Sequence, residues 1–399
     1  MKTLLESTLL HLHQLVAFDT RNPPRVIGTD GMFDYLRTQL PDFDITVTDH
    51  GAGAVSMLAV RGRPRLLFNV HLDTVPAAPG WSRDPHELLV TDDRATGLGA
   101  CDIKGAAAGL LAVARAIDKP MALLFSTDEE ANDARCIKTF LKAFPPLPSG
   151  EGRGEGTLGA KYSGQTEPSP PAPLPEGEGS FKAVIVAEPT QSRAVLAHRG
   201  IQSACMRFHG RAGHASAEQK PGDSALHQAV EWSHAALGFV TAQASHSFGG
   251  LHGLRFNIGR IEGGIKANVI APEAELRFNM RPLPDMDPDG LLAQFRDMAL
   301  PGTHLQETFR GPALPAGDPA QAEVRCREAE ALADELGFPI GHAVDFWTEA
   351  AKFSTAGYTT FVYGPGDITQ AHSADEWVAL EQLADYAASI HRVVEAGQA

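Results

Sequence analysis

Three short apolar runs, each followed by acidic residues or a histidine, restrict the possible folds of this chain more than any other feature. They are RLLFNVHLD (65–73), MALLFSTDEE (121–130) and KAVIVAEPT (182–190). Continuous apolar character over a few residues is typical of strands covered on both faces, as in parallel sheets. A strongly helix-forming stretch lies between the first two runs at 97–117. The pattern therefore predicts an α/β domain with a mostly parallel central sheet, whose ligands gather beyond the carboxyl ends of the strands.

The composition is that of an acidic globular protein. Its 399 residues exceed what one core normally organises, so we expect two or more domains. The formal net charge of -15 argues against binding to nucleic acid or anionic membranes. Polar residues such as Glu6 and His11 interrupt the apolar N-terminus, which predicts an amphipathic helix and no targeting segment. Widely spaced cysteines at 101, 136, 205 and 326 indicate a protein of the reducing cytoplasm without structural disulfides.

A low-complexity stretch occupies residues 145–181. Proline, glycine, glutamate and serine dominate it, and PLPSGEGRGEG and PLPEGEG look like two copies of one short repeat. Such a composition cannot bury enough apolar surface to fold. We therefore expect a disordered surface insertion that carries no catalytic residues.

The pattern changes near residue 194. The stretches 196–210, 254–264 and 274–281 alternate apolar and polar residues, as strands of an open antiparallel sheet do. Helices are expected over 223–240 and 287–299, and a final helix over 376–395 returns to the first domain. We therefore expect a discontinuous catalytic domain, 1–193 and 302–399, with an α+β lid domain inserted over 194–301.

Residues of types that commonly bind metals occur at the ends of the predicted strands and loops. His71, Asp102, Glu130 and Glu188 lie at or just after such ends, and His372 is a late candidate. Two histidines and three carboxylates suit two zinc ions, with cobalt or manganese as substitutes, if one carboxylate bridges both ions. Each acid taken alone would more often be a surface carboxylate. Their coincidence at separate ends favours a metal site.

Two further acids stand beside these candidates. Asp73 lies two residues after His71, so in an extended strand both side chains point the same way, and the carboxylate could orient the histidine ring. A turn-forming or helix-capping aspartate is the alternative. Glu129 precedes Glu130, and a free carboxylate there is suited to take a proton from an attacking water.

These motifs resemble those of the co-catalytic zinc aminoacylases and carboxypeptidases, a family that includes acetylornithine deacetylase and succinyl-diaminopimelate desuccinylase. The matching stretches follow the family order and span nearly the whole chain apart from the insertion: HLDTVP (71–76), GLGACDIKG (97–105), STDEE (126–130), AEPT (187–190), RAGHAS (211–216), NVIAPEAELRFNMRPLP (268–284) and AHSADEW (371–377). The resemblance implies a zinc-exopeptidase-like catalytic domain and a lid domain through which two copies form a homodimer.

The resemblance also implies roles for the candidate residues. Asp102 bridges two divalent metal ions, and Glu129 is the general base, with Asp73 orienting a ligand. The remaining ligands form one pair for each ion: His71 with Glu188, and Glu130 with His372.

Further roles in the lid and beside it come from the same resemblance. His214 would stabilise the tetrahedral oxyanion, commonly from the lid of the partner, although a histidine in a turn is more often simply solvated. Asn268 and Arg281 would hold the substrate α-carboxylate, helped by a backbone loop at Gly364 and Gly366. An arginine fork suits a carboxylate, and a solvated strand residue is the alternative.

The expected reaction is removal of the acetyl group from an N-acetyl amino acid. TEAAKF (348–353) and the DEW after His372 resemble the acetylornithine branch, and the chain also resembles its variant that acts on N-acetyl-L-citrulline in arginine biosynthesis. An unpaired carboxylate at Glu349 would instead favour the ornithine ammonium. N-acetyl-L-ornithine, succinyl-diaminopimelate and peptides stay open as substrates. A metal-containing binding protein without catalysis is the alternative of another class.

Overall fold

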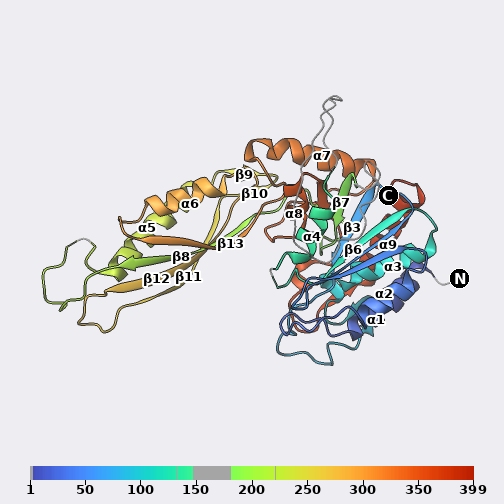
Figure 1. Ribbon diagram of the computed structural model, residues 1–399, viewed down its shortest axis with the longest axis horizontal. Helices are drawn as coiled ribbons and strands as arrows, with labels where there is room; N and C mark the ends of the chain where they lie inside the picture. The colour runs from blue at the N-terminus through green and yellow to red at the C-terminus, as the bar shows by residue number, and fades with distance from the viewer. Residues whose placement is uncertain (1–2, 132, 147–180, 221) are drawn as a thin grey trace, which may run out of the picture. The chain divides into compact units, whose positions relative to one another are not determined.

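The computed structural model describes residues 3–131, 133–146, 181–220 and 222–399 of the chain (Figure 1). They form two compact units. Unit 1 consists of Met1–Pro189, Ala356–Tyr358 and Pro365–Ala399, and unit 2 of Thr190–Thr355 and Thr359–Gly364. Unit 2 contains the whole segment 194–301 for which a lid is expected and continues beyond it. The expected disordered insertion falls almost entirely on residues 147–180, which lie outside the described residues.

Unit 1 contains a mixed sheet that includes all three apolar runs of the sequence. Five of its strands stand side by side in the order β1-β2-β6-β3-β7. Their bounds are Asp44–Asp49 (β1), Val55–Arg61 (β2), Met121–Ser126 (β6), Leu66–His71 (β3) and Ala183–Val186 (β7). β3 is parallel to both β6 and β7, whereas β2 is antiparallel to β1 and β6, so β2 alone of these five strands runs in reverse. Every residue of β3, β6 and β7 is buried, as their apolar runs predict.

Helices accompany this sheet in unit 1 (Figure 1). They are α1 (Leu4–Ala17), α2 (Met32–Gln39), α3 (Gly105–Ala116), α4 (Arg135–Ala143) and α9 (Leu380–Glu395). The sequence begins α1 with a capping box, in which Thr3 and Glu6 bond each other's backbone N–H. α1, α3 and α9 pack on one another. Gly109 permits the close approach of α3 to α9, because a Cβ there would lie 2.9 Å from the ring of Tyr386.

A second, three-stranded sheet of unit 1 corrects the expected C-terminal helix. Its strands are β4 (Leu89–Val90), β5 (Arg94–Thr96) and β15 (Trp377–Ala379), in the order β15-β5-β4. The helix expected over 376–395 therefore begins only at Leu380. Trp377 pairs with Thr96 instead, and this pairing brings residue 376 to the segment that contains Asp102.

Unit 2 contains an antiparallel sheet of four strands in the order β11-β12-β8-β13. The strands are β8 (Ile201–His209), β11 (Arg255–Gly263), β12 (Glu273–Arg281) and β13 (His304–Gly311). Other elements in the same part of the chain are α5 (Ala225–Ala242), β9 (Ser247–Phe248), β10 (Leu251–His252), α6 (Pro288–Asp297), α7 (Ala322–Glu335), α8 (Ala350–Ala356) and β14 (Thr359–Val362). Ser224 and Asp287 cap the N-termini of α5 and α6. The predicted open antiparallel sheet is thus present.

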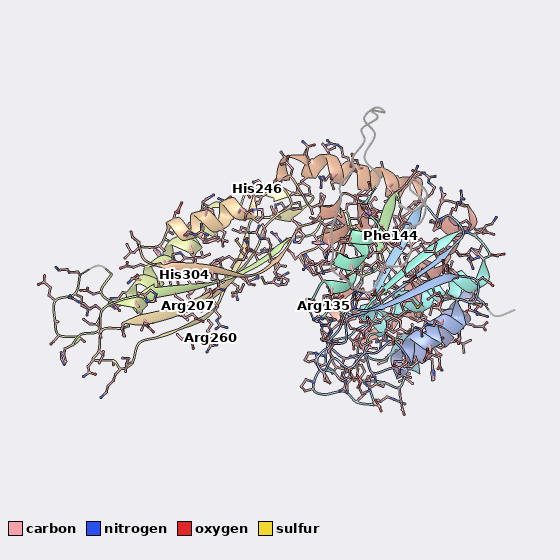
Figure 2. All side chains as sticks on the ribbon, viewed as in Figure 1. Arg135, Phe144, Arg207, His246, Arg260 and His304 are labelled. Atoms are coloured by element: carbon pink, nitrogen blue, oxygen red, sulfur yellow. The ribbon has the colours of Figure 1, made fainter. Side chains whose placement is uncertain are left out.

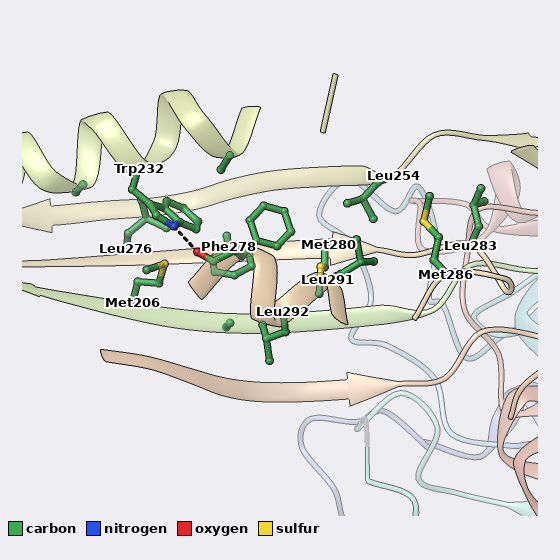
Figure 3. Packing of buried hydrophobic residues seen from close by; sticks show 14 of the residues in the cluster. Met206, Trp232, Leu254, Leu276, Phe278, Met280, Leu283, Met286, Leu291 and Leu292 are labelled. Atoms are coloured by element: carbon green, nitrogen blue, oxygen red, sulfur yellow. Dashed lines mark hydrogen bonds between the residues drawn. The ribbon is translucent and has the colours of Figure 1, made fainter. Parts of the chain in front are cut away.

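The core of unit 2 lies between one sheet face and the helices α5 and α6 (Figure 3). Trp232 of α5 packs 5.2 Å from the ring centroid of Phe278, and its Nε1–H donates to the carbonyl oxygen of Phe295 at 2.8 Å. The sheet alternation buries Leu276 and Phe278, whereas Arg207 and Arg277 on the other face are exposed (Figure 2). One-sided alternation in the sequence therefore produces a sheet with one covered and one polar face.

Two general features complete the description. All four cysteines of the chain are free. Among the helices of the described residues, none combines the length and apolar character needed to cross a membrane.

Candidate metal centre

The candidate metal ligands gather in unit 1, where the buried parallel strands end. His71 is the last residue of β3 and lies in register with Ser126, the last residue of β6. Glu130 follows β6 and Glu188 follows β7. Because parallel strands end at the same edge of a sheet, their following residues are brought together there.

Asp102 stands between two histidines. Its Oδ1 lies 3.2 Å from Nε2 of His71, and its Oδ2 lies 3.2 Å from Nε2 of His372. Each histidine also approaches one glutamate: Nε2 of His71 is 3.8 Å from Glu188 Oε2, and Nε2 of His372 is 3.0 Å from Glu130 Oε1. The five side chains therefore form two groups that share Asp102, which is the arrangement a bridging carboxylate requires.

The carboxylates of the two groups raise the pKa of both histidines. Burial lowers the pKa of His71, but hydrogen bonds that its ring donates to the carboxylates of Asp102, Asp73 and Glu188 raise it well above its ordinary value. Hydrogen bonds with Asp102 and Glu130 raise the pKa of His372 to about 10. Burial raises the pKa of Glu188 to about 7. The carboxylates of both groups thus favour positive charge on the two histidines.

The residues present fit two divalent metal ions. In each group, one donor atom from every residue lies within 4.8 Å of the others, so the three donors can face a single ion. Imidazole nitrogens and carboxylate oxygens are the donors that zinc and similar divalent ions accept. Two cations would also balance the negative charge of these carboxylates.

Asp73 contacts one residue of each group, His71 and Glu130. It is fully buried, and its Oδ1 lies 3.5 Å from Nδ1 of His71, which also lies 3.0 Å from the backbone oxygen of Asp73. Its Oδ2 accepts hydrogen bonds from the backbone N–H of Glu130 at 3.1 Å and from Asn22 at 3.0 Å. Asn22 was not predicted, because it occurs in the breaker-rich stretch DTRNPP (19–24), which indicates only a turn.

Glu129 lies in the turn after β6, next to Glu130, and is half-buried. It is thus less buried than Asp73, which is fully buried.

His214 and Asn268 lie on exposed loops of unit 2. Nδ1 of His214 accepts a hydrogen bond from the backbone N–H of Ser216 at 3.2 Å and lies 2.7 Å from its hydroxyl. The proton of the neutral imidazole is therefore on Nε2. The backbone oxygen of Asn268 accepts from the N–H of Ala215, which joins the two loops.

Arg281 is half-buried at the end of β12 and belongs to a cluster of charged residues. Burial lowers the pKa of its guanidinium, and the negative charge of Asp345 opposes this. Arg199 is fully buried, pairs with Asp345, and donates to the carbonyl oxygens of Gly253 at 2.6 Å and Arg281 at 3.4 Å. Arg199 and Asp345 were not predicted, because no spacing in the sequence indicates their contact.

The remaining candidates are Gly364, Gly366 and Glu349, and each lies close to another residue. The N–H of Gly364 donates to the hydroxyl of Thr190 at 3.0 Å. Gly366 has a φ of 89°, and a Cβ there would meet Sγ of Cys101 at 2.6 Å. Glu349, which is 1% exposed, pairs with Lys352 at 3.4 Å.

Comparison with known proteins gives one family and several close relatives. The model of peptidase family M20/M25/M40 matches residues 67–396. The chain is 58% identical, over 396 residues and 99% of each chain, to a protein of Xanthomonas campestris pv. campestris named N-acetyl-L-citrulline deacetylase. It is 30% identical to the acetylornithine deacetylase of Vibrio vulnificus, over 85% of this chain and 83% of that protein.

Solved structures extend the likeness to the fold. Aminopeptidase PepT from Bacillus cereus matches with a TM-score of 0.67 and 17% identity, covering 99% of both chains. Human carnosine dipeptidase 1 matches with a TM-score of 0.64 and 13% identity, covering 99% of this chain and 97% of that one. At such low identity these matches concern the fold alone, and they confirm the predicted exopeptidase-like architecture.

Proposed function

The chain belongs to peptidase family M20/M25/M40, and from that membership we propose that it is a metal-dependent amide hydrolase that deacetylates N-acetyl-L-citrulline. The observation that carries the proposal is Asp102, whose two carboxylate oxygens each lie 3.2 Å from a different histidine. The 58% identity to the Xanthomonas protein, over nearly the whole of both chains, supports the substrate.

Two divalent ions, zinc first and cobalt or manganese as substitutes, would be held by the two groups that share Asp102. His71 and Glu188 would complete one site, and Glu130 and His372 the other. When bound, such ions polarise the amide carbonyl and lower the pKa of the attacking water.

Glu129 and Asp73 would have different roles near the metal ions. Glu129 accepts the proton of the attacking water and returns it to the departing amine, for which its partial exposure is suited. Asp73 holds His71 in orientation through the ring nitrogen that faces away from Asp102. The two acids are therefore not interchangeable: one exchanges protons and the other stays buried and fixed.

Unit 2 would supply substrate recognition. His214 donates its Nε2–H to the oxyanion that develops on the carbonyl oxygen, consistent with the tautomer set by Ser216. Arg281 binds the α-carboxylate through its planar guanidinium, which can donate two parallel hydrogen bonds. Arg199 donates a hydrogen bond to the backbone oxygen of Arg281. Asn268 and the backbone at Gly364 and Gly366 assist. We also propose that the lid segment 194–301 forms a homodimer, and that the protein acts in cytoplasmic arginine biosynthesis.

The pair of Glu349 and Lys352 favours a neutral substrate side chain. Nζ of Lys352 lies 3.4 Å from the Glu349 carboxylate and 4.8 Å from the ring centroid of Trp347. A carboxylate paired in this way has little charge left to attract the ammonium of ornithine. The ureido group of citrulline is neutral and needs only hydrogen bonds, so the pair supports acetylcitrulline over acetylornithine.

Steady-state kinetics on the metal-loaded protein test this function. We expect kcat/KM for N-acetyl-L-citrulline to exceed that for N-acetyl-L-ornithine at least tenfold, or about 1.4 kcal/mol in transition-state binding. A dipeptide and succinyl-diaminopimelate serve as comparison substrates. A preference for acetylornithine would refute the substrate, and two bound ions without hydrolysis of any of these amides would indicate a binding protein.

A further inference from the structure

Glu376 is a buried carboxylate that none of the roles above employs. It is 1% exposed. Its Oε1 accepts the backbone N–H of Cys101 at 2.9 Å and of Asp102 at 3.0 Å, and its Oε2 accepts that of Gly99 at 3.1 Å. The two oxygens of one side chain thus hold three backbone N–H groups of the 99–102 segment at once. The side chain thus fixes the backbone that leads into Asp102.

The main chain on either side of Glu376 reinforces this contact. The carbonyl oxygen of Glu376 accepts the N–H of Gly97 at 2.9 Å. The next residue, Trp377, pairs with Thr96 where β15 meets β5. The backbone at residues 376 and 377 is thus paired with residues 96 and 97, which directly precede the 99–102 segment that the Glu376 side chain holds.

The segment that leads from His372 to Glu376 is held in an unusual conformation. His372 and Asp375 both have a φ of 56°, in the left-handed region that residues other than glycine rarely adopt. Asp375 accepts hydrogen bonds from the N–H and the hydroxyl of Ser82, each at 3.0 Å. Such conformations persist where surrounding contacts determine them, and the bonds of Asp375 and Glu376 are contacts of that kind.

We propose that Glu376 is a positioning residue, which ties the turn of Asp102 to the segment of His372 and thereby sets the geometry of the group Asp102, Glu130 and His372. The inference rests on the proposed function in taking this group as a metal site. Residues that orient metal ligands typically change metal affinity by about 10- to 100-fold when they are replaced.

Two substitutions separate geometry from charge. Glu376→Gln keeps the length and one acceptor oxygen, so the bonds from Cys101 and Asp102 can persist, but it turns an amide N–H₂ toward the N–H of Gly99. Glu376→Asp keeps the charge but shortens the side chain by one methylene, which moves both oxygens away from all three donors. Glu381→Gln, at an exposed position in the first turn of α9, is the matched control.

The experiment measures metal affinity of the metal-free proteins by competition with a chromophoric chelator for Zn²⁺ and Co²⁺. We expect affinity to fall about 10- to 100-fold in Glu376→Gln, at least as far in Glu376→Asp, and not in the control. The visible spectrum of bound Co²⁺ should also change in the two Glu376 variants. Wild-type affinity in Glu376→Asp would assign the effect to charge alone and overturn the inference.

Two further results would overturn the inference. One is unchanged affinity in Glu376→Gln together with lower thermal stability of the metal-free protein, because this is what a purely structural role predicts. The other needs no variant: rapid hydrogen exchange at the amides of Gly99, Cys101 and Asp102 in the metal-free wild type. Failure of the wild type to bind metal would instead refute the proposed function, whatever the exchange rates are.

Discussion

Replacing Asp73 by asparagine and by alanine should separate metal binding from folding stability. In the wild type, Oδ2 of Asp73 accepts hydrogen bonds from Asn22 and from the backbone of Glu130, and Oδ1 faces His71. Asparagine can keep both bonds with its single oxygen, so we expect it to lower the free energy of unfolding less than alanine does. Alanine leaves two buried donors without this acceptor, at about 1–3 kcal/mol each, which gives a loss of about 2–6 kcal/mol.

Metal affinity, unlike stability, should already fall strongly in the asparagine variant. Asp73→Asn removes the negative charge beside Nδ1 of His71, although the backbone oxygen of residue 73 still lies 3.0 Å from that nitrogen. We expect metal affinity to fall about 10- to 100-fold, or about 1.4–2.7 kcal/mol, with kcat/KM falling in parallel. Urea unfolding of the metal-free proteins gives the stabilities, and chelator competition gives the affinities. Equal stability of the two variants, or wild-type affinity in Asp73→Asn, would refute the reasoning.

Three other predictions follow from the site and from unit 2. Glu129→Gln should reduce kcat at least a hundredfold while metal analysis still finds two ions, because general bases typically contribute about 10²–10⁴-fold; near-normal kcat would exclude Glu129 as the base. Binding of Zn²⁺ to the metal-free protein at pH 7 should release protons, because a His372 with a pKa of about 10 is protonated there; calorimetry in buffers of different ionisation enthalpy measures this, and identical heats would contradict it. Burial lowers the pKa of His198 to about 4, below its unfolded value near 6.5, so this histidine contributes stability that is complete above pH 6.5 and is lost as the pH falls toward 4, by about 3 kcal/mol. Comparison of urea unfolding at pH 7 and 4.5 should show a smaller pH dependence in His198→Asn than in the wild type.

Much of the fold could be predicted because the order of apolar and polar residues along the chain reflects which side chains are buried. β3, β6 and β7 are buried throughout and appear in the sequence as continuous apolar runs. β12 buries Leu276 and Phe278 and leaves Arg277 exposed, so its alternation indicates a sheet with one covered face. The short strand β15 was mistaken for the start of a helix, because three residues are too few to show a period of their own.

The site could be predicted only in part, for a related reason. Ligands at strand ends are recognisable because the sheet brings those ends to one edge. Asn22 contacts Asp73, and Glu376 contacts Asp102, through hydrogen bonds between segments 51 and 274 residues apart. Contacts of this kind depend on tertiary structure and leave no local period or spacing in the sequence.

The position of Asp102 has a thermodynamic consequence for metal loading. Because one carboxylate gives an oxygen to each group, the order that one bound ion would impose on Asp102 would already be present when the other ion arrives. By linkage, each ion must change the affinity for the other by the same factor. In the proposed two-metal centre the two ions would therefore not bind independently, and a half-loaded form would be a distinct species whose abundance depends on this mutual coupling.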